Sequence, residues 1–575
     1  MRQTIRFGEF ELDESAYELR RGGRPVRLER QPMDVLLLLA ARRGELISRA
    51  DIVDLLWGKD AVIDVETGVN TAIRKIRRAL NDSRGAPSAI ATVPGKGYRF
   101  VADVEVGGAD ETASTVLAVL PFANLSGDPE REYVADGLTE DTIASLSQLD
   151  PGHLAIIGRT SAMAYRGTNK SLALIGAELH AGFVLEGSVR MEADALRIRC
   201  ALSRTRDQVQ VWSSSFDRPM ASLLDVQREL SIAIADQVRV HLSPERLEAV
   251  ARRHTENPAA YDLYLRGRRL WHQLMPTTTR MAVEYFMRAT EADAGYALAW
   301  SGLAQAYAAA PINGDADPRE MWPLARAAAD RAVGSNPELS EAQRMSGEVD
   351  WFFKWDLRAA DGAYRRAVDL DPNNASAQTM FGHALSQLGR HAEAQEVMER
   401  AGALEPLSPF HVAMASQVAY QARDVRRAAE RARRAIVLDP EFWVGHMMRG
   451  QAAELDGDLD LALDELATAA RLSGGNSKPV SLRGYVLAKA GRREEAHEVL
   501  AMLADVSRSR YMPPYAQALV ALGLEQEELA FDHLERAYEA GDVHLLFLTV
   551  DEKWDRVRSH PRFHAVLRRC GFMDQ

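Results

Sequence analysis

Small residues recur every 34 positions through the second half of this chain. One register comprises Ala360, Ala394, Ala428, Ala462, Ala496 and Ala530. A second comprises Ala367, Ala401, Ala435, Ala469 and Ala537, with Leu503 in its one gap, and a third comprises Gly382, Ser416, Gly450, Gly484 and Ala518. Small side chains are needed where two antiparallel helices cross closely, and Pro372, Pro406 and Pro440 end three successive repeats. The period therefore predicts stacked helix pairs.

This pattern resembles the tetratricopeptide repeat (TPR). We expect about eight repeats over residues 256–544, and a segment over residues 545–575 that caps the last apolar face. The resemblance implies a concave surface for a protein, peptide or small ligand. By repeat register, that surface would present His383, Gln417, Tyr420, Gln451 and Tyr485. The alternative is that these five residues are ordinary polar surface or pack between repeats.

The first hundred residues contain an amphipathic segment with a strongly basic side. Val69, Ile73, Ile76 and Leu80 are spaced four, three and four residues apart, which predicts a helix with one apolar face. The rest of the helix carries Asn70, Arg74, Lys75, Arg77 and Arg78. Arg side chains match guanine edges and phosphates, and Asn matches adenine, so the helix suits the major groove of DNA. The alternative for the helix alone is a solvated charged face.

A hairpin pattern follows the basic helix. Two short apolar segments in residues 91–100 flank a turn at Gly95, Lys96 and Gly97, which predicts two strands with a lysine at the tip. Residues 65–100 hold seven Lys or Arg against two Asp or Glu, although the whole chain has a formal net charge of −12. Binding to DNA depends on local contacts, so an acidic chain with one basic stripe remains compatible with it.

Strands, three helices and a hairpin in this order, with VNTAIRKIRRAL and ATVPGKGYRF at this separation, resemble the winged helix-turn-helix domain of OmpR/PhoB-type transcription regulators. The resemblance covers residues 1–105. It implies that the third helix enters the major groove through Asn70, Thr71, Arg74, Lys75, Arg77 and Arg78. It implies wing contacts to the DNA backbone from Thr92, Lys96 and Tyr98, and an RNA polymerase contact from the loop Trp57 to Asp64. Ser48 is expected to cap the second helix.

A small polar linker over residues 106–114 precedes a middle region in which strands alternate with helices. The strings VLAVLPFANLSGDPEREYVADGLTEDTIASLS, AYRG and FVLEGSVR resemble the TolB amino-terminal-like domain over residues 115–243. A helix from about Leu223 to Leu242 is expected to close it. Asp136, Glu140 and Asp141 would either bind a cation or form the polar face of a helix; we expect no metal site.

Composition and motifs exclude several function classes. No apolar run approaches the roughly 20 residues of a membrane helix, and no secretory signal is visible. The two cysteines, Cys200 and Cys570, fit no metal spacing and are expected to be buried thiols in a reducing cytoplasm. We find no nucleophile elbow, P-loop, zinc motif or adenylate cyclase catalytic segment. The sequence therefore predicts no enzyme and no cofactor.

We expect a multidomain α+β chain: a winged helix, a small α/β domain and an all-α TPR solenoid. The domain order resembles CadC- and HilA-type regulators. The resemblance implies a cytoplasmic transcription regulator that binds double-stranded promoter DNA, contacts RNA polymerase and binds head to tail as two copies. The TPR array would receive a protein or small-ligand signal. The alternative is an interaction scaffold whose winged helix binds protein instead of DNA.

Overall fold

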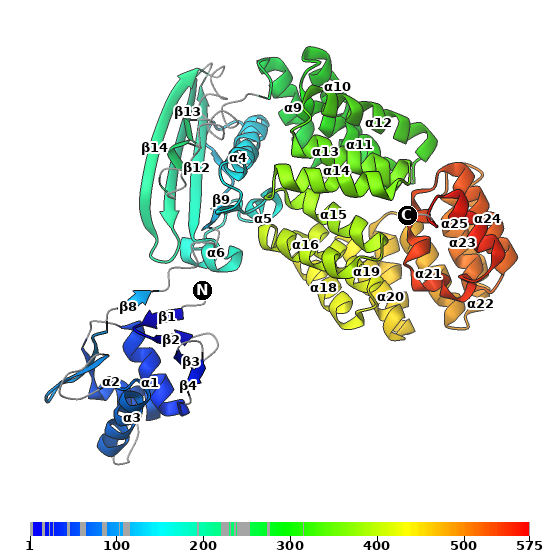
Figure 1. Ribbon diagram of the computed structural model, residues 1–575. Coiled ribbons are helices and arrows are strands. Elements are labelled where there is room, and N and C mark those ends of the chain that lie inside the picture. Colours follow the sequence, from blue (N-terminus) through cyan, green and yellow to red (C-terminus); the bar gives the residue numbers. More distant parts are fainter. Residues whose placement is uncertain are drawn as a thin grey trace. The chain divides into compact units, whose positions relative to one another are not determined.

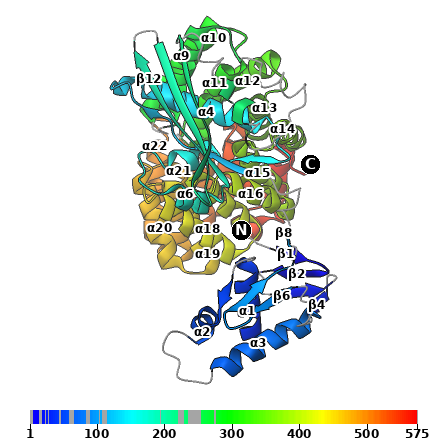
Figure 2. The same cartoon turned by 90° about the vertical axis from the view of Figure 1, so that its left-hand side faces the viewer.

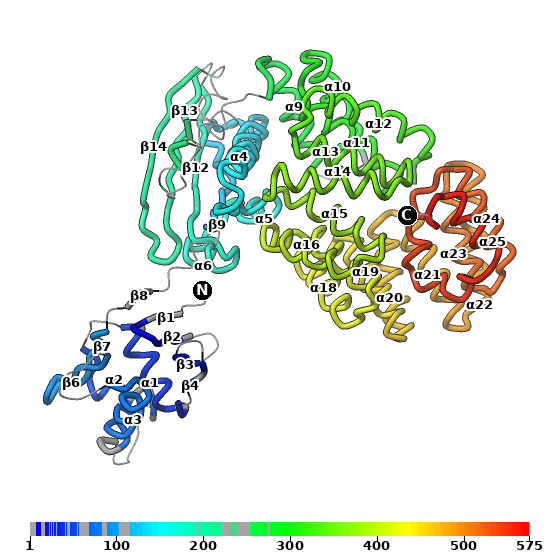
Figure 3. Tube along the Cα trace, in the orientation of Figure 1, coloured from blue at the N-terminus to red at the C-terminus, as the bar shows by residue number. Residues whose placement is uncertain are grey.

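The computed structural model describes residues 4–13, 18–21, 24–26, 28–42, 46–57, 65–82, 89–102, 104–106, 115–192, 195–219, 229–230, 232–234, 237, 254–272, 276–313 and 315–573. The chain divides into two compact units, Met1–Ser114 and Thr115–Gln575 (Figures 1 and 3). The expected polymerase loop at 58–64 and most of the linker, 107–114, lie outside the described residues. Most of the expected helix 223–242 does so too.

The first unit begins with an antiparallel sheet. Its strands are β1 (Thr4–Phe7), β2 (Phe10–Asp13), β3 (Glu18–Arg21), β4 (Arg24–Val26) and β8 (Val104–Val106), in the order β4-β3-β2-β1-β8. Because β8 pairs with β1, the sheet joins the start of this unit to its end. Val106, which we assigned to the linker, is thus the last residue of a strand.

Three helices and a second small sheet complete this unit. The helices are α1 (Arg30–Ala41), α2 (Arg49–Trp57) and α3 (Val65–Ala79), and the strands are β5 (Ile47–Ser48), β6 (Ile90–Val93) and β7 (Gly97–Phe100). Val69, Ile73, Ile76 and Leu80 are all buried in one core with residues of α1 and the strands, as their spacing predicts. Figure 2 shows α1 and α3 side by side, and β6 and β7 pair as the hairpin that forms the wing (Figure 3).

The second helix begins as the sequence predicts. The Asp51 backbone N–H donates to the Ser48 hydroxyl (3.1 Å), and the Ser48 N–H and hydroxyl both donate to the Asp51 carboxylate (2.9 and 2.8 Å). This reciprocal capping satisfies two groups that a helix start leaves open. These hydrogen bonds lower the pKa of Asp51. Ile47 and Ser48 also pair with the wing strand β7, which ties the start of α2 to the wing.

The second unit starts with the α/β domain. Its main sheet has the order β11-β9-β12-β13-β14, with β9 parallel to β11 and β12, and the other pairs antiparallel. The strands are β9 (Thr115–Val119), β10 (Ala123–Asn124), β11 (Leu154–Ile156), β12 (Phe183–Glu192), β13 (Ala195–Arg204) and β14 (Val209–Pro219). The helices are α4 (Glu132–Ser147), α5 (Arg159–Met163) and α6 (Leu172–Leu179). Strand β10 pairs with β12.

Helix pairs fill the rest of the second unit, as the 34-residue period predicts (Figure 1). In the described residues they run from α9 (Pro258–Trp271) with α10 (Pro276–Ala292) to α23 (Pro514–Gly523) with α24 (Glu527–Ala540). Between them lie α11 (Ala297–Asn313), α12 (Pro318–Ser335), α13 (Ser340–Glu348), α14 (Leu357–Leu370), α15 (Ala375–Gln387), α16 (His391–Leu404), α17 (Pro409–Gln421), α18 (Val425–Leu438), α19 (Trp443–Asp456), α20 (Leu459–Leu472), α21 (Ser477–Lys489) and α22 (Arg493–Val506). The six alanines of the first register are all buried.

The α/β domain packs directly on the repeats. The Tyr133 hydroxyl donates to Asp262 (2.5 Å), and both Arg159 and Arg268 pair with Glu140. A second contact joins Asn373, before α15, to the backbone carbonyls of Ser147 and Leu154 (3.0 Å each). These polar contacts join the two parts, which form one compact unit.

A further contact ties two distant parts of the repeat array together. The connection between α11 and α12 meets the start of α21: the Asn476 amide donates to the Asn313 carbonyl (2.9 Å), and the Ser477 N–H and hydroxyl donate to Asp315 (2.9 and 2.6 Å).

After α24, the chain turns at Gly541 into two short 3-10 helices, η4 (Val543–Thr549) and η5 (Glu552–Val557), and ends in α25 (Pro561–Arg569).

Candidate nucleic-acid interface

The outer side of α3 presents two arginines to solvent. Arg74 and Arg78 lie one helical turn apart, opposite the buried face, and both are exposed. Thr71 lies on the same side one turn before them and is partly exposed. A helix with guanidinium groups in a row can enter a major groove and reach base edges or phosphates. We call Thr71, Arg74 and Arg78 the outer ridge.

Arg77 does not lie on the outer ridge. Its guanidinium donates to the Ile90 carbonyl (2.7 Å) and to the Thr92 hydroxyl (2.9 Å), both on β6. The side chain is half-buried between α3 and the wing. We expected Arg77 and Thr92 to contact DNA; the structure instead joins them to each other, so they fix the position of the wing relative to α3.

A second polar contact between α3, α2 and the wing involves Asn70 and Tyr98. The Tyr98 hydroxyl donates to the Asn70 side-chain oxygen (3.1 Å), and Arg49 donates to both groups (3.1 Å to Asn70, 3.0 Å to Tyr98). The Arg49 guanidinium also lies over the Tyr98 ring, 5.4 Å from its centre. The Tyr98 side chain is buried, whereas Asn70 is exposed. Tyr98 therefore supports the wing, and Asn70 remains at the surface.

Sequence reasoning did not single out Arg49. It follows the capping residue Ser48, so it stands in the first turn of α2, where acidic residues are more usual than basic ones. That departure from the usual preference is the one signal in the sequence that points to a specific role.

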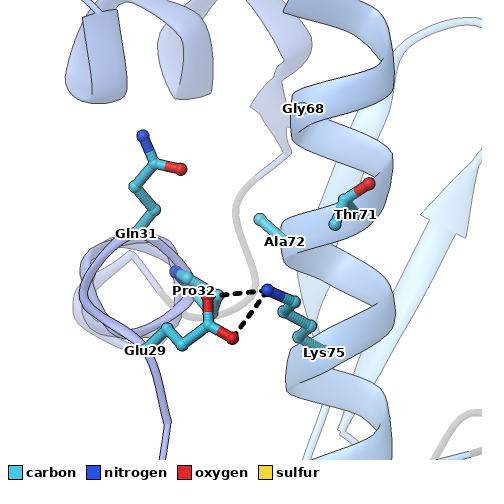
Figure 4. A pocket seen from close by; sticks show the side chains of 7 residues that line it. All are labelled: Glu29, Gln31, Pro32, Gly68, Thr71, Ala72 and Lys75. Carbon is cyan, nitrogen blue, oxygen red and sulfur yellow. Dashed lines mark hydrogen bonds and ion pairs between the residues drawn. The ribbon is translucent and has the colours of Figure 1, made fainter.

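Lys75 lies on the other flank of α3, beside the start of α1. Its ammonium group contacts the Glu29 carboxylate at 2.6 Å, at the edge of a shallow pocket of 290 Å³ (Figure 4). The pocket is lined by Glu29, Gln31, Pro32, Gly68, Thr71, Ala72 and Lys75. Both charged side chains are well exposed, 41% for Lys75 and 71% for Glu29, so water screens their attraction and a phosphate can compete for Lys75.

The wing ends in an exposed turn. Lys96 is exposed at its tip, and its backbone N–H donates to the Val93 carbonyl (3.0 Å). Gly97 begins β7 at the point where the wing meets β5. A Cβ atom there would lie 2.0 Å from the Ile47 carbonyl oxygen, so only glycine fits. The wing tip thus presents the exposed ammonium group of Lys96 on a tightly packed base.

The inner face of the repeats was the second predicted site. Helices α15, α17, α19 and α21 carry His383, Gln417, Gln451 and Tyr485 in equivalent positions, and the chain's own C-terminal segment contacts His383, Tyr420 and Tyr485. His383, Gln417, Tyr420 and Gln451 are between 3% and 6% exposed, and Tyr485 is half-buried. The Tyr420 hydroxyl donates to Asp551 (2.9 Å) and Phe547 lies 6.3 Å from the His383 ring. At His383, Tyr420 and Tyr485 the predicted surface is thus in contact with residues of the segment 543–557, whereas Gln451 donates to Gln417 (3.4 Å). That these five residues bind a partner stays a prediction.

The acidic residues of α4 are engaged in ion pairs and hydrogen bonds, some within the α/β domain and some with the repeats. Asp136 pairs with Arg166, and Glu140 pairs with Arg159 and Arg268. The Tyr261 hydroxyl donates to Asp141. Despite burial, the neighbouring cations lower the pKa of Glu140 well below its ordinary value. Of the two alternatives for these carboxylates, the structure supports the polar helix face. The described residues contain no group of three or more metal-ligating side chains suited to an ion.

Comparison with known proteins first defines a class. Residues 23–100 match the family described as "Transcriptional regulatory protein, C terminal", which is the OmpR/PhoB-type winged helix. Residues 113–232 match the "HilA/YgeH-like transcriptional regulator, second domain", and residues 363–396 match a tetratricopeptide repeat. Three parts of the chain therefore match, in order, a winged helix of the OmpR/PhoB type, a HilA/YgeH-like second domain and a tetratricopeptide repeat.

Individual relatives share these parts in different combinations. Transcriptional regulator HilA of Salmonella typhimurium is 21% identical over 393 residues, 68% of each chain. "Putative adenylate cyclase 3" of Rhizobium meliloti is 36% identical over 191 residues, 33% of this chain and 32% of its own. Transcriptional activator CadC of Escherichia coli is 32% identical over 102 residues, 18% of this chain and 20% of its own. The chain therefore matches a third or less of the length of these last two relatives.

Solved structures match the separate parts. The DNA-binding domain of Klebsiella pneumoniae RstA, solved in complex with the RstA box, is 32% identical, covers 17% of this chain and 96% of that chain, and has a TM-score of 0.16. The type IV pilus biogenesis factor PilW is 19% identical, covers 35% of this chain and 91% of its own, and has a TM-score of 0.30. In the described residues, no helix is both long and apolar enough to cross a membrane.

Proposed function

We propose that this chain is a transcription regulator that binds promoter DNA through the outer ridge of α3 and the tip of the wing. The observation that carries the proposal is the exposure of Arg74 and Arg78 on the side of α3 opposite its core. The family matches to transcriptional regulators support the same function. No observation favours the scaffold alternative, in which the winged helix binds protein.

The proposed contacts divide by their structural role. Thr71, Arg74 and Arg78 would meet base edges and phosphates in the major groove, and Asn70 would meet a base at the side of the wing. Lys75 and Lys96 would meet phosphates on either side. Arg77, Thr92 and Tyr98 would act indirectly, because their polar groups are bonded within the domain.

The other partners follow from this proposal. RNA polymerase would be contacted through the loop after α2, and two copies would bind head to tail on direct repeats. The TPR array would receive a signal from a protein or small ligand, and no catalysis or cofactor is proposed. The proposed location is the cytoplasm, where promoter DNA would be within reach.

A salt titration of DNA binding by the full chain tests the proposal. Genomic fragments enriched by the chain in vitro supply the DNA probe. We expect the logarithm of affinity to fall linearly with the logarithm of salt concentration, because phosphate contacts release counterions. The double variant Arg74→Ala/Arg78→Ala should bind at least tenfold more weakly. The matched control Arg508→Ala/Arg510→Ala removes two exposed arginines from the repeats and should bind like the parent chain. Equal affinity of both double variants would contradict the proposed interface.

A further inference from the structure

A lysine side chain is buried on the inner face of the repeats. Lys553, in η5, is 3% exposed. Its ammonium group donates to the Tyr420 hydroxyl, lies 3.4 Å from the carboxylates of Glu454 and of Asp551 in its own segment, and lies 5.8 Å from the centre of the Tyr485 ring. We call Tyr420, Glu454 and Tyr485 the lysine socket. A hydroxyl acceptor, a carboxylate and an aromatic ring can together hold a desolvated ammonium ion.

The socket belongs to the repeats, and its occupant belongs to the C-terminal segment. The three socket residues come from α17, α19 and α21, and Tyr420 and Glu454 are 34 residues apart, in equivalent positions. Lys489 on α21 contacts Glu454 at 2.5 Å and so braces that carboxylate. Burial alone would lower the pKa of Lys553, but Asp551, Tyr420 and Glu454 outweigh it and raise that pKa well above its ordinary value. The lysine is therefore charged in the socket.

The C-terminal segment fits the neighbouring inner face poorly. The side-chain nitrogens and oxygens of His383, Gln387 and Gln421 are buried, and in the described residues these six atoms have no hydrogen-bond partner. Gln387 and Gln421 are 34 residues apart, on α15 and α17, and each is 3% exposed. A buried polar group without a partner is unfavourable by about 1–3 kcal/mol. An extended peptide carries free N–H and C=O groups that could satisfy such side chains.

Other contacts hold the segment in place. Leu545, Leu546, Leu548 and Trp554 are at most 2% exposed, and the Trp554 indole N–H donates to the Tyr515 hydroxyl (3.0 Å). Arg423 contacts Asp555 at 2.5 Å. This apolar burial favours the bound segment when nothing competes for the face. The segment thus combines good apolar packing with unmatched polar groups.

We propose that the inner face of α15–α21 is a binding site for a lysine-bearing extended peptide of a partner protein, and that residues 543–557 are its resident intramolecular occupant. A lysine of the partner peptide would enter the socket in place of Lys553. The backbone of that peptide would contact Gln387, Gln421 and His383. This inference rests on the proposed function, because it identifies where the TPR array receives its signal. A partner peptide displaces residues 543–557 only if its binding free energy on this face exceeds theirs.

Hydrogen exchange on the unaltered full chain provides the first test. A displaceable occupant must open without unfolding of the repeats, so the amides of residues 543–557 should exchange at least tenfold faster than the core amides of α17 and α19. If the segment exchanges only together with those helices, it is a fixed part of their core and the proposal is overturned.

Peptide binding provides the second test. The probe is a labelled synthetic peptide of residues 541–558, and the host is the full chain with Asp551→Ala and Lys553→Ala, which weakens the resident segment. We expect the probe to bind this host at least tenfold more tightly than it binds the unaltered chain. A probe with Lys553→Ala should lose at least tenfold in affinity, whereas a control probe with Arg556→Ala, whose arginine contacts Glu527 outside the socket, should lose less than threefold.

Two readouts keep the interpretation clear. Circular dichroism of the host confirms that the repeats remain folded, and the host variant Glu454→Gln should weaken the probe without altering the helix content. Equal affinity of the lysine and alanine probes would overturn the proposal. Peptide binding is measured without DNA, so its failure with intact DNA binding refutes only the lysine site. Loss of DNA binding with intact peptide binding refutes only the proposed function.

Discussion

Neighbouring arginines on α3 have different tasks because the helix turns by about 100° per residue. Arg74 and Arg78 are directed away from the core, and Arg77 is rotated toward the wing, where it finds the Ile90 carbonyl. A basic run in a sequence is therefore not a uniform binding surface. Each position must be assigned by what it faces.

Arg74→Ala and Arg77→Ala should consequently affect different properties, the first DNA affinity and the second stability. We expect Arg74→Ala to weaken DNA binding by roughly 1–3 kcal/mol with an unchanged melting temperature, since its guanidinium is free to reach DNA. Arg77→Ala should lower the stability of the winged helix by about 1–3 kcal/mol, because the buried Ile90 carbonyl loses a donor. Binding isotherms and thermal melts of both variants measure the difference. Identical melting temperatures for the two variants would contradict the assignment of Arg77.

Glu29→Gln should strengthen DNA binding. The change removes a negative charge beside α3 and releases Lys75 from its exposed ion pair, so Lys75 meets a phosphate without first leaving a carboxylate. We expect a several-fold gain in affinity at low salt that fades as salt is raised. Glu11→Gln, which removes a charge from β2, serves as the control. A gain of equal size in the control would show that only net charge matters.

At the scale of elements, the wing depends on Gly97, which has no side chain at the point where β7 meets β5. Gly97→Ala would place a methyl group against the Ile47 carbonyl oxygen and break the pairing that anchors the hairpin to the start of α2. We expect a loss of at least about 1–3 kcal/mol in stability and a parallel loss of DNA affinity.

Gly95→Asn is the matched control, because Gly95 has a positive φ of 72° that Asn tolerates and no neighbour within 4 Å. Thermal unfolding and the dispersion of wing amide signals in NMR spectra report the outcome. A stable Gly97→Ala wing would mean that the β5 contact is dispensable.

Helices were predictable from the sequence where apolar or small residues recur at a regular spacing. The apolar spacing of Val69 to Leu80 identified α3, and the recurrence of alanines identified the repeats, because both patterns reflect close helix packing. The helix begins at Val65, earlier than the apolar spacing indicates, since its first turn lacks that pattern. The occupation of the inner face was not predictable, because it depends on where a segment after the last repeat folds back. Only the equivalence of Tyr420 and Glu454 hinted at a shared site.

At the scale of the molecule, a buried carboxyl couples the α/β domain to the repeats. Burial raises the pKa of Asp371 to about 7, and Glu341 adds to this, whereas hydrogen bonds from Asn373 and Ser147 act in the opposite direction. Because the folded chain holds this proton more tightly than the unfolded chain, whose Asp pKa is about 3.9, stability falls as pH rises from about 4 to about 7 and then levels off.

Asp371→Asn should therefore stabilise the second unit at pH 8 and leave it nearly unchanged at pH 4. The amide preserves the acceptor for the Asn373 N–H and has no charge to bury. We expect a rise of several degrees in melting temperature at pH 8, against no rise for the exposed control Asp369→Asn. A lower melting temperature of Asp371→Asn at pH 8 would show that the carboxylate is needed in its charged form.

The link between Asp315 and the start of α21 has a consequence for how the repeats unfold. An open solenoid can lose its end repeats one at a time, because each touches only the next. Here the second helix pair also depends on a pair that lies more than 160 residues later. Deletion of the last repeats would remove the contact partner of an early repeat. The array should therefore melt in a single cooperative step, and fragments with fewer repeats should be less stable than the whole array.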